Sequence, residues 1–529
     1  GNPNGSYTVQ LTQSELDEVI AKQLGSKLDV QDIPSTAKVL SYGVELRPTS
    51  FGKRQNIFSF YAEDQFAASA KLNLTIGVRY DYDNLSAGGN SHGDYNNIAP
   101  RFSFNYKLSD RSALRGGYGI FYDKILYTIY SDALQQNNTG TDFKKQLQYF
   151  VDQGIVPAGT NIDRVTFNGN LTVGESNSAG LPFGYLNGPP ASTYDNQRNL
   201  FSNERRILNP NGYQNPYTQQ ISLGYQYQIK SNQLFYVDLV YNKSNNLFRT
   251  RNLNVPSAWN SEVAGNTARA TSWADSTRAL PIYSNGAVIN AQVLSGVAKS
   301  VVMTETSGES EYWAASFNWQ KDRGTGKLAY RLIYTLSYLR NNTEDVNFRA
   351  MDANNFSNEW GPSINDRRHI INGILNYYPL KGLTATLAFM LQSGQPINRV
   401  PDGSKFLIIN SKGTPLGGTT NDLNGDGSAF GDSYVGNSDR YPGVSRNSDR
   451  LPWSKTIDLG LQCRISLGTK SALEIRTDIF NILNTINLSG YSNNANQSNQ
   501  IQFGPQGAPI VQKNAAPPRQ FQFGVRYLF

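Results

Sequence analysis

The sequence predicts an all-β protein, a transmembrane antiparallel β-barrel with long extracellular loops. Three observations support this prediction. Short segments of alternating apolar and polar residues recur along the chain, tight turns and long loops alternate between them, and the final segment, 520–529, ends on an aromatic residue. Alternation with period two is the pattern of a strand with two different faces. A closed antiparallel barrel is a sheet that leaves no backbone group unpaired in lipid.

The terminal strand shows the pattern most clearly. Its apolar face carries Phe521, Phe523, Val525, Tyr527 and Phe529, and its polar face carries Gln520, Gln522, Gly524 and Arg526. We interpret the apolar face as the side that contacts outer-membrane lipid and the polar face as the side that contacts a water-filled lumen. An ordinary last strand of a soluble sandwich is the alternative for this segment taken alone.

Earlier segments repeat this alternation in chain order. In 72–82, for example, Leu72, Leu74 and Ile76 share one face, while Asn73 and Thr75 share the other. A short helix is predicted at 14–24, before Gly25, because its apolar residues lose the period of two. The count is about fifteen strands. Their predicted ranges are 7–11, 37–47, 57–66, 72–82, 98–108, 113–122, 217–229, 233–242, 311–321, 328–340, 369–378, 383–393, 453–467, 471–482 and the terminal strand.

The connections fall into two classes that alternate strictly. Turns of a few residues, such as 109–112 and 230–232, are followed by long loops such as 123–216, 249–310 and 394–452. Short turns on one rim and long loops on the other are typical of an outer-membrane barrel. A soluble sandwich or propeller is not expected to keep that order.

Composition excludes several other classes. Aromatic residues make up 12% of the chain, mean hydropathy is −0.48, and no apolar run is long enough for a transmembrane helix. The net charge of +7 is spread thinly, which argues against nucleic acid as a partner. The chain has one cysteine, Cys463, and two histidines, His92 and His369, so a zinc site or a Ser-His-Asp hydrolase is not expected. We therefore predict no enzyme activity.

One local motif resembles a metal site. Asp422, Asn424 and Asp426 place oxygen atoms at positions one, three and five of a loop, and Gly427 stands at position six, as in the first half of a calcium loop. The closing glutamate is missing, because position twelve is Ser433. Calcium binding and a glycine-rich turn without metal are both compatible with these residues. Calcium is the only cofactor that the sequence suggests.

Several segments together resemble the TonB-dependent outer-membrane transporters, in their Oar-like branch. The segments that carry the resemblance are LNLTIGVRYDY (72–82), IAPRFSFNY (98–106), LRGGYGIFYD (114–123), INDRRH (364–369), DLNGDG (422–427), DRYPGVSRNS (439–448), EIRTDIFNILN (474–484) and PPRQFQFGVRYLF (517–529). In the last of them, Gln522, Gly524, Tyr527 and Phe529 resemble the signal that the barrel-assembly machinery recognises. They sample the chain from about residue 57 to its end.

The resemblance implies a location in the bacterial cell outer membrane and a barrel of about 22 strands around a plug. It also implies import driven by the TonB energy complex, which acts through the plug. The sequence shows no plug domain and too few strands. We therefore expect residues 1–529 to form the C-terminal part of the barrel, completed by an N-terminal fragment that carries the plug and the first strands. The substrate class stays open among peptide, protein, glycan and metal chelate.

Two other functions stay open at this stage. A passive outer-membrane porin would share the barrel but lack the plug and the energy dependence. A secreted all-β protein that binds or degrades glycans would need paired acidic residues in a cleft. Glu474 and Asp478 share a strand face, but no feature of the sequence shows that they frame a sugar.

Overall fold

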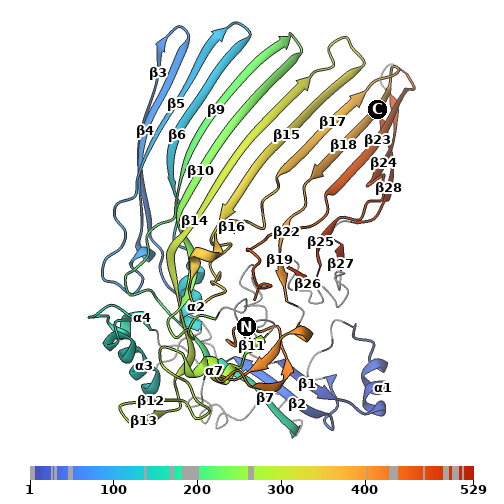
Figure 1. Cartoon of the computed structure of the whole chain (residues 1–529). Coiled ribbons are helices and arrows are strands. Elements are labelled where there is room, and N and C mark those ends of the chain that lie inside the picture. Colours follow the sequence, from blue (N-terminus) through green and yellow to red (C-terminus); the bar gives the residue numbers. More distant parts are fainter. Residues whose placement is uncertain are drawn as a thin grey trace.

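A single curved antiparallel sheet dominates the computed structural model of the chain (Figure 1). The structure describes residues 6–25, 28, 32–45, 52–135, 140–166, 172–181, 202–259, 267–401, 403–427, 439–468, 471–491, 500–502, 512–514 and 517–529. Thirteen strands follow one another along the sheet in chain order, from β3 at one edge to β28 at the other, and β8 and β16 pair at its side. The predicted all-β antiparallel fold is confirmed.

The thirteen strands correspond to the segments that the alternation predicts. They are β3 (Ile57–Ser69), β4 (Leu72–Asp83), β5 (Ile98–Ser109), β6 (Ser112–Tyr122), β9 (Tyr217–Lys230), β10 (Gln233–Asn252), β14 (Ala298–Lys321), β15 (Leu328–Asn341), β17 (His369–Tyr377), β18 (Leu383–Gln392), β23 (Ser454–Ser466), β24 (Ala472–Phe480) and β28 (Gln520–Leu528). The side strands are β8 (Ser202–Ile207), parallel to β14, and β16 (Gly361–Pro362), antiparallel to β15.

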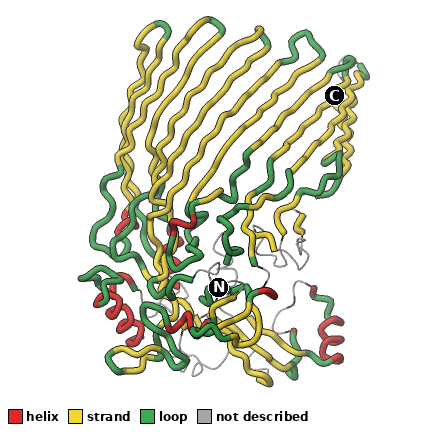
Figure 2. The backbone as a smooth tube through the Cα atoms, viewed as in Figure 1, coloured by secondary structure: helices red, strands yellow, loops and turns green. Residues whose placement is uncertain are grey.

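Short turns and long loops alternate strictly along this sheet, as predicted. The hairpins β3–β4, β5–β6, β9–β10, β14–β15, β17–β18 and β23–β24 all turn at one end, which we call the short-turn end. Figures 1 and 2 show these turns together at the top and the long connections, with their helices, at the bottom. We call the bottom the long-loop end.

The apolar face of the sheet is left uncovered by the rest of the chain. Phe102, Ile221, Leu239, Trp313 and Ile475 are each at least 41% exposed, although they lie in strands that have a neighbour on both sides. A soluble sandwich would bury such residues between two sheets. The exposed apolar face is the surface expected to contact lipid. None of the helices among the described residues is long and apolar enough to cross a membrane.

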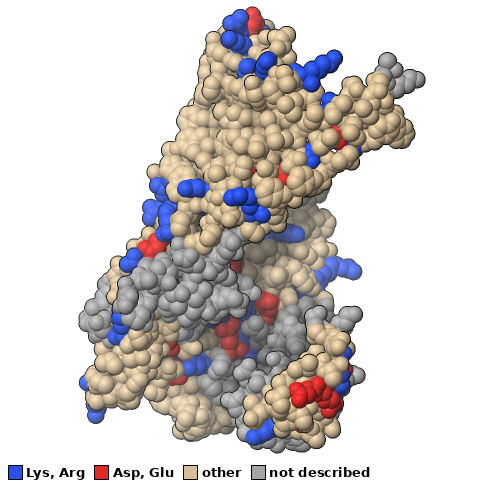
Figure 3. Space-filling model, turned by 90° about the vertical axis from the view of Figure 1, so that its right-hand side faces the viewer, with Lys and Arg blue, Asp and Glu red and all other residues tan. Residues whose placement is uncertain are grey.

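On the side of the molecule seen in Figure 3, charged residues are sparse in the middle of the sheet wall. In the view of Figure 3, most of the wall formed by the strands is free of Lys, Arg, Asp and Glu. Charged side chains gather at the short turns and again toward the long-loop end. Such a band between two charged zones fits a hydrocarbon layer with a polar boundary on each side, because a buried charge in lipid is costly.

The two N-terminal segments predicted as strands form a small separate sheet. β1 (Ser6–Gln10) pairs with β2 (Lys38–Glu45), and β2 pairs with β7 (Thr172–Leu181). The predicted helix is α1 (Gln13–Ala21), which begins after Thr12 in a capping box. Thr12 Oγ1 accepts from the Glu15 amide, and Glu15 Oε2 accepts from the Thr12 amide at 2.7 Å.

The long loops contain elements that the alternation does not predict. The helices are α2 (Tyr127–Gln135), α3 (Thr141–Asp152), α4 (Ile162–Val165) and α7 (Thr271–Ser276), with 3-10 turns at Asn84–Ala87, Phe356–Glu359 and Gly403–Lys405. The small strands are β11 (Thr267–Arg269), β12 (Ala287–Ile289), β13 (Gln292–Leu294), β19 (Pro396–Val400), β20 (Leu407–Ile409), β21 (Pro415–Thr419), β22 (Asp449–Arg450), β25 (Leu488–Tyr491), β26 (Gln500–Gln502) and β27 (Gln512–Asn514). Many of the fully buried apolar residues lie among these elements, including Phe143, Leu147 and Phe150 of α3. The long-loop end is therefore a packed structure.

Candidate functional site

The polar face of the sheet forms a row of side chains in register across seven neighbouring strands. From β4 to β15 the row contains Asn73, Asn105, Arg115, Gly224, Asp238, Ser316 and Thr335. The next row, which lies on the apolar face, contains Leu74, Phe104, Gly116, Leu223, Leu239, Ala315 and Leu336. In these two rows one face is hydrophilic and the other is apolar, as expected for a wall between a water-filled lumen and lipid.

An ion pair at the centre of this polar row depends on a glycine. Arg115 Nη2 lies 2.6 Å from Asp238 Oδ1, and Arg115 Nη1 donates to Gln226 Oε1 at 3.0 Å. The two charged residues belong to β6 and β10, and Gly224 of β9 lies between them. A Cβ at Gly224 would collide with Asp238 Oδ1 and lie 2.9 Å from Arg115 Nε. Glycine thus leaves the space in which the charges meet.

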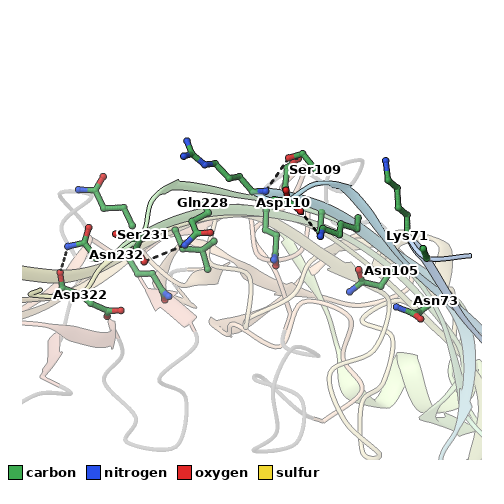
Figure 4. A pocket seen from close by; sticks show the side chains of 18 residues that line it. Lys71, Asn73, Asn105, Ser109, Asp110, Gln228, Ser231, Asn232 and Asp322 are labelled. Atoms are coloured by element: carbon green, nitrogen blue, oxygen red, sulfur yellow. Dashed lines mark hydrogen bonds and ion pairs between the residues drawn. The ribbon is translucent and has the colours of Figure 1, made fainter. Parts of the chain in front are cut away.

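A polar cavity of about 550 Å³ lies at the short-turn end. Its lining comes from four hairpins and includes Lys71, Asp110, Asn232 and Asp322 (Figure 4). Asn232 Nδ2 donates to the Asp322 carbonyl at 3.0 Å, which ties two neighbouring hairpins together. The cavity offers both hydrogen-bond donors and acceptors, so it suits a polar surface better than an apolar ligand.

The apolar face carries aromatic rings toward the long-loop end of the strands. Tyr241 and Trp313 pack with ring centroids 4.0 Å apart, and the guanidinium of Arg368 lies 3.4 Å from the Tyr338 ring centroid. Tyr241, Trp313 and Tyr338 are in register on three neighbouring strands. Aromatic girdles of this kind mark the boundary between hydrocarbon and headgroups in outer-membrane barrels.

Buried ion pairs join two of the long loops. Arg440 Nη1 lies 2.8 Å from Glu359 Oε2, and Arg446 Nη1 lies 2.7 Å from Glu344 Oε1. Arg446 is fully buried and also donates through Nε to the Glu359 carbonyl at 2.7 Å. Glu344 and Glu359 belong to the β15–β17 loop, whereas both arginines belong to the β18–β23 loop. The two loops are therefore fixed to each other.

The loop predicted as a calcium site is compact, and its carboxylates accept hydrogen bonds from its own amides. Asp422 Oδ1 and Oδ2 accept from the amides of Gly425 and Gly427 at 2.8 and 3.0 Å, and Asn424 Oδ1 accepts from Asp426 at 2.8 Å. Gly425 has φ +72°, and a Cβ there would lie 2.5 Å from the Arg269 carbonyl oxygen. Ser433, at position twelve, lies outside the described residues.

A further carboxylate that the motif does not contain lies beside this loop. Asp439 is 4% exposed, and its Oδ2 accepts from the Leu423 amide at 2.8 Å. Burial and the nearby Asp426 raise the pKa of Asp422 to about 6, and burial with the same neighbours raises the pKa of Asp439 well above its usual range. Within the described part of the chain, no group of three or more His, Cys, Asp or Glu residues is arranged to hold a metal ion. Calcium binding by Asp422, Asn424 and Asp426 stays a prediction.

Three residues of the predicted assembly signal lie on β28, at the edge of the sheet, and the fourth, Phe529, directly follows this strand. Gln522 and Gly524 pair with Asp478 and Arg476 of β24, on the polar face. Tyr527 and Phe529 lie on the apolar face, with ring centroids 6.0 Å apart, and are 56% and 97% exposed. The predicted division of the strand into two faces is confirmed, whereas its recognition by the assembly machinery stays a prediction.

Comparisons with known proteins agree with this geometry. Residues 84–522 match the family described as outer membrane beta barrel domain, and residues 8–146 match the TonB dependent receptor-like beta-barrel. No curated protein sequence matches the chain.

Solved structures show the same fold at low sequence identity. The outer membrane transporter YddB from Escherichia coli is 11% identical with a TM-score of 0.50, over 93% of this chain and 50% of its own. The siderophore receptor PirA from Acinetobacter baumannii is 13% identical with a TM-score of 0.45, over 93% of this chain and 51% of its own. The chain thus spans about half the length of these proteins. Because the first family match covers most of the sequence, the chain belongs to the outer membrane β-barrel family, and its location is the bacterial outer membrane.

Proposed function

We propose that this chain is the barrel portion of an active transporter of the TonB-dependent class, in its Oar-like branch. The observation that carries the proposal is the match of residues 8–146 to the TonB dependent receptor-like barrel, in a sheet whose polar face is continuous. The similar Escherichia coli structure is that of an outer membrane transporter, which is consistent with the proposal. Cargo binds to the long loops, and the polar row guides it through the lumen.

Two open sheet edges support completion of the barrel by further strands. β3 and β28 each have one neighbour in the sheet, and every residue of β3 is exposed. An unpaired strand edge in hydrocarbon leaves backbone amides and carbonyls without partners, which is costly. Strands outside these 529 residues, pairing with β3 and β28, remove that cost.

The short-turn cavity supports a plug that fills the lumen. Its polar lining includes Lys71, Lys107 and Arg111 together with Asp110 and Asp322, so it presents both charges at the end that faces the periplasm. A folded plug needs such a surface, because polar contacts to the wall can be exchanged when the energy complex pulls on it. Movement of the plug then couples binding to import.

Conductance and partner binding test this proposal. The purified whole protein, inserted in a planar bilayer, is expected to show no steady ion conductance and to bind the periplasmic domain of TonB. A passive porin would give a large steady conductance and would not bind TonB. That pair of results would refute active transport and leave the barrel assignment intact.

We also propose that the Asp422 loop binds calcium and that the bound ion makes the long-loop end more rigid. Support comes from the buried Asp439, which adds a carboxylate beside Asp422 and Asp426. Titration of the purified protein with calcium chloride is expected to release heat, and Asp426→Asn is expected to weaken binding about tenfold or more. Asp163→Asn, far from the loop in sequence and on α4, is the control. No heat with the unmodified protein would refute the site.

A further inference from the structure

A second polar cavity, of about 300 Å³, lies among the long loops. Its walls come from β8, from the ends of β10 and β14, from the segments on both sides of α7, and from residues 349–354 and 424–427. The lining contains Trp259, four cationic residues (Arg269, Arg278, Lys299 and Arg349) and three acidic ones (Glu204, Asp352 and Asp426). The cavity therefore gathers more cationic groups than one expects in the interior of a loop assembly.

Arg269 is the most unusual of these residues because it is buried without an ion pair. Its side chain is 2% exposed. Nε donates to the Asn424 carbonyl at 2.6 Å, and Nη1 donates to the Ser257 carbonyl at 2.8 Å. Within the described residues Arg269 forms no ion pair, and its hydrogen bonds come from Nε and Nη1 and none from Nη2. Burial lowers the pKa of Arg269, and the charge of Asp426 partly opposes that effect.

Two more donors of the lining residues also lack acceptors. Arg278 is 3% exposed; its Nε pairs with Asp275 at 2.8 Å and its Nη1 donates to the Asn254 carbonyl, but its buried Nη2 has no partner. The indole Nε1 of Trp259 is likewise buried and without a partner. The Trp259 ring lies 5.5 Å from the Arg269 guanidinium. Buried donors in native proteins are normally satisfied, so these two, Arg278 Nη2 and Trp259 Nε1, point to a missing acceptor beside Arg269.

The acidic residues of the lining, Glu204, Asp352 and Asp426, already have other partners. Glu204 forms ion pairs with Arg206 and Arg349. Asp352 Oδ1 accepts from the Trp259 amide at 3.1 Å, and Asp426 Oδ2 accepts from Asn424 Nδ2 at 3.3 Å. Asp275 is shared between Arg278 and Lys299. What the cavity lacks is an oxygen with negative charge. A carboxylate fits, because its two oxygens match the fork of a guanidinium.

We infer that this cavity binds the carboxylate group of a ligand, through Arg269 Nη2, Arg278 Nη2 and Trp259 Nε1. The negative charges of Asp352 and Asp426 disfavour a doubly charged anion such as phosphate. Their oxygens can also accept hydrogen bonds from an ammonium or hydroxyl group of the same ligand. The inference deepens the proposed transport function, because it names the chemical group by which cargo is held. It rests on that function only for the identification of the ligand as cargo.

Binding of simple probes to the purified whole protein tests the site. The probes are trialanine, its C-terminal amide and inorganic phosphate, each titrated calorimetrically. We expect trialanine to bind, the amide to show no measurable binding, and phosphate to bind at least about tenfold more weakly than trialanine. Equal binding of trialanine and its amide, or no binding of trialanine at millimolar concentration, would overturn the inference.

Two variants and a matched control locate the binding. Arg269→Lys keeps the charge but loses the guanidinium fork, and Trp259→Phe keeps the ring but loses Nε1. Both are expected to weaken carboxylate binding about tenfold or more. Trp273→Phe is the control, because Trp273 packs edge-on against Trp259 at 5.0 Å but does not line the cavity. Equal affinity in all three variants overturns the inference.

These measurements are independent of the energy complex. If the conductance test shows a passive porin, the carboxylate site is still supported by binding of the carboxylate and by weaker binding in Arg269→Lys. If the probes fail to bind while the protein is plugged and binds TonB, the carboxylate site is wrong and the transport proposal is unaffected.

Discussion

Removing the charge of Glu359 gives the most direct test of how the long loops are held. The Glu359 side chain is fully buried, and its two oxygens lie 2.8 and 3.1 Å from Nη1 and Nη2 of Arg440, which is 3% exposed. In Glu359→Gln the guanidinium stays buried without a counter-charge. Breaking a buried pair by removing one partner typically costs about 3–5 kcal/mol. That cost falls on the loop structure, because both residues lie outside the sheet.

Hydrogen exchange on the purified protein measures this cost locally. Amides near residues 344–363 and 439–447 are expected to exchange about a hundredfold to several thousandfold faster, since a tenfold change corresponds to about 1.4 kcal/mol. Amides in β17 and β18 are expected to keep their protection. Asp163→Asn is the control, because its partner Lys144 is 42% exposed and surface pairs contribute little.

A double variant separates the charge from the packing. Replacing both partners, as in Glu359→Leu with Arg440→Met, removes the unpaired charge and is expected to recover part of the lost protection. Unchanged exchange in Glu359→Gln would refute the reasoning, because it would mean that water reaches Arg440 in spite of its burial. A double variant worse than the single one would show that packing, and not charge, holds the loops.

Two further changes test the membrane face and the chain end. Leu223→Arg places a charge at an exposed position of the apolar face and is expected to lower the free energy of unfolding in vesicles by about 2–4 kcal/mol. Ser222→Arg, on the polar face, is expected to be tolerated. Urea titrations measure both variants, and equal losses of stability would contradict the assignment of faces. Deletion of Phe529, which is 97% exposed, is expected to reduce the fraction of protein assembled in the outer membrane more than Phe521→Ala does. Heat-modifiable mobility on gels measures this fraction. Equal assembly of the two variants would refute the terminal signal.

The sheet could be predicted because the two faces of each strand contact different environments, and this produces a regular alternation of apolar and polar residues. Lipid on one face and water on the other force alternation, so β4 and β9 follow directly from the sequence. β14 shows where the pattern ends. The predicted strand begins at residue 311, but the observed one begins at Ala298. Val301 and Val302 are consecutive and both fully buried, so this part of the strand is covered on both faces and the alternation disappears.

The candidate sites were predictable only where their residues are adjacent in the chain. Asp422, Asn424 and Asp426 form a local motif, and the structure brings them together as the spacing suggests. Asp439 could not be assigned to the same loop, because its contact with Leu423 depends on how the long loop folds back. Arg446 and Glu344 lie 102 residues apart and belong to different loops. No periodicity links such residues, so only the folded structure reveals the pair.

The lengths of β10 and β14 explain how a precise cavity can exist among long loops. A tilted strand needs about 9–11 residues to cross the hydrocarbon, whereas β10 has 20 residues and β14 has 24. Their outer halves pair with each other from Leu247 to Asn252, beyond the last residue that pairs with β15. At about 3.3 Å per residue, the stretch from Ser310 to Lys299 projects on the order of 30 Å. Asn252 and Lys299, at the ends of this ribbon, line the loop cavity. One wall of the cavity is thus built on strands, which hold side chains more rigidly than loops do, and Trp259, Arg269 and Arg278 of the β10–β14 loop complete the site against that wall.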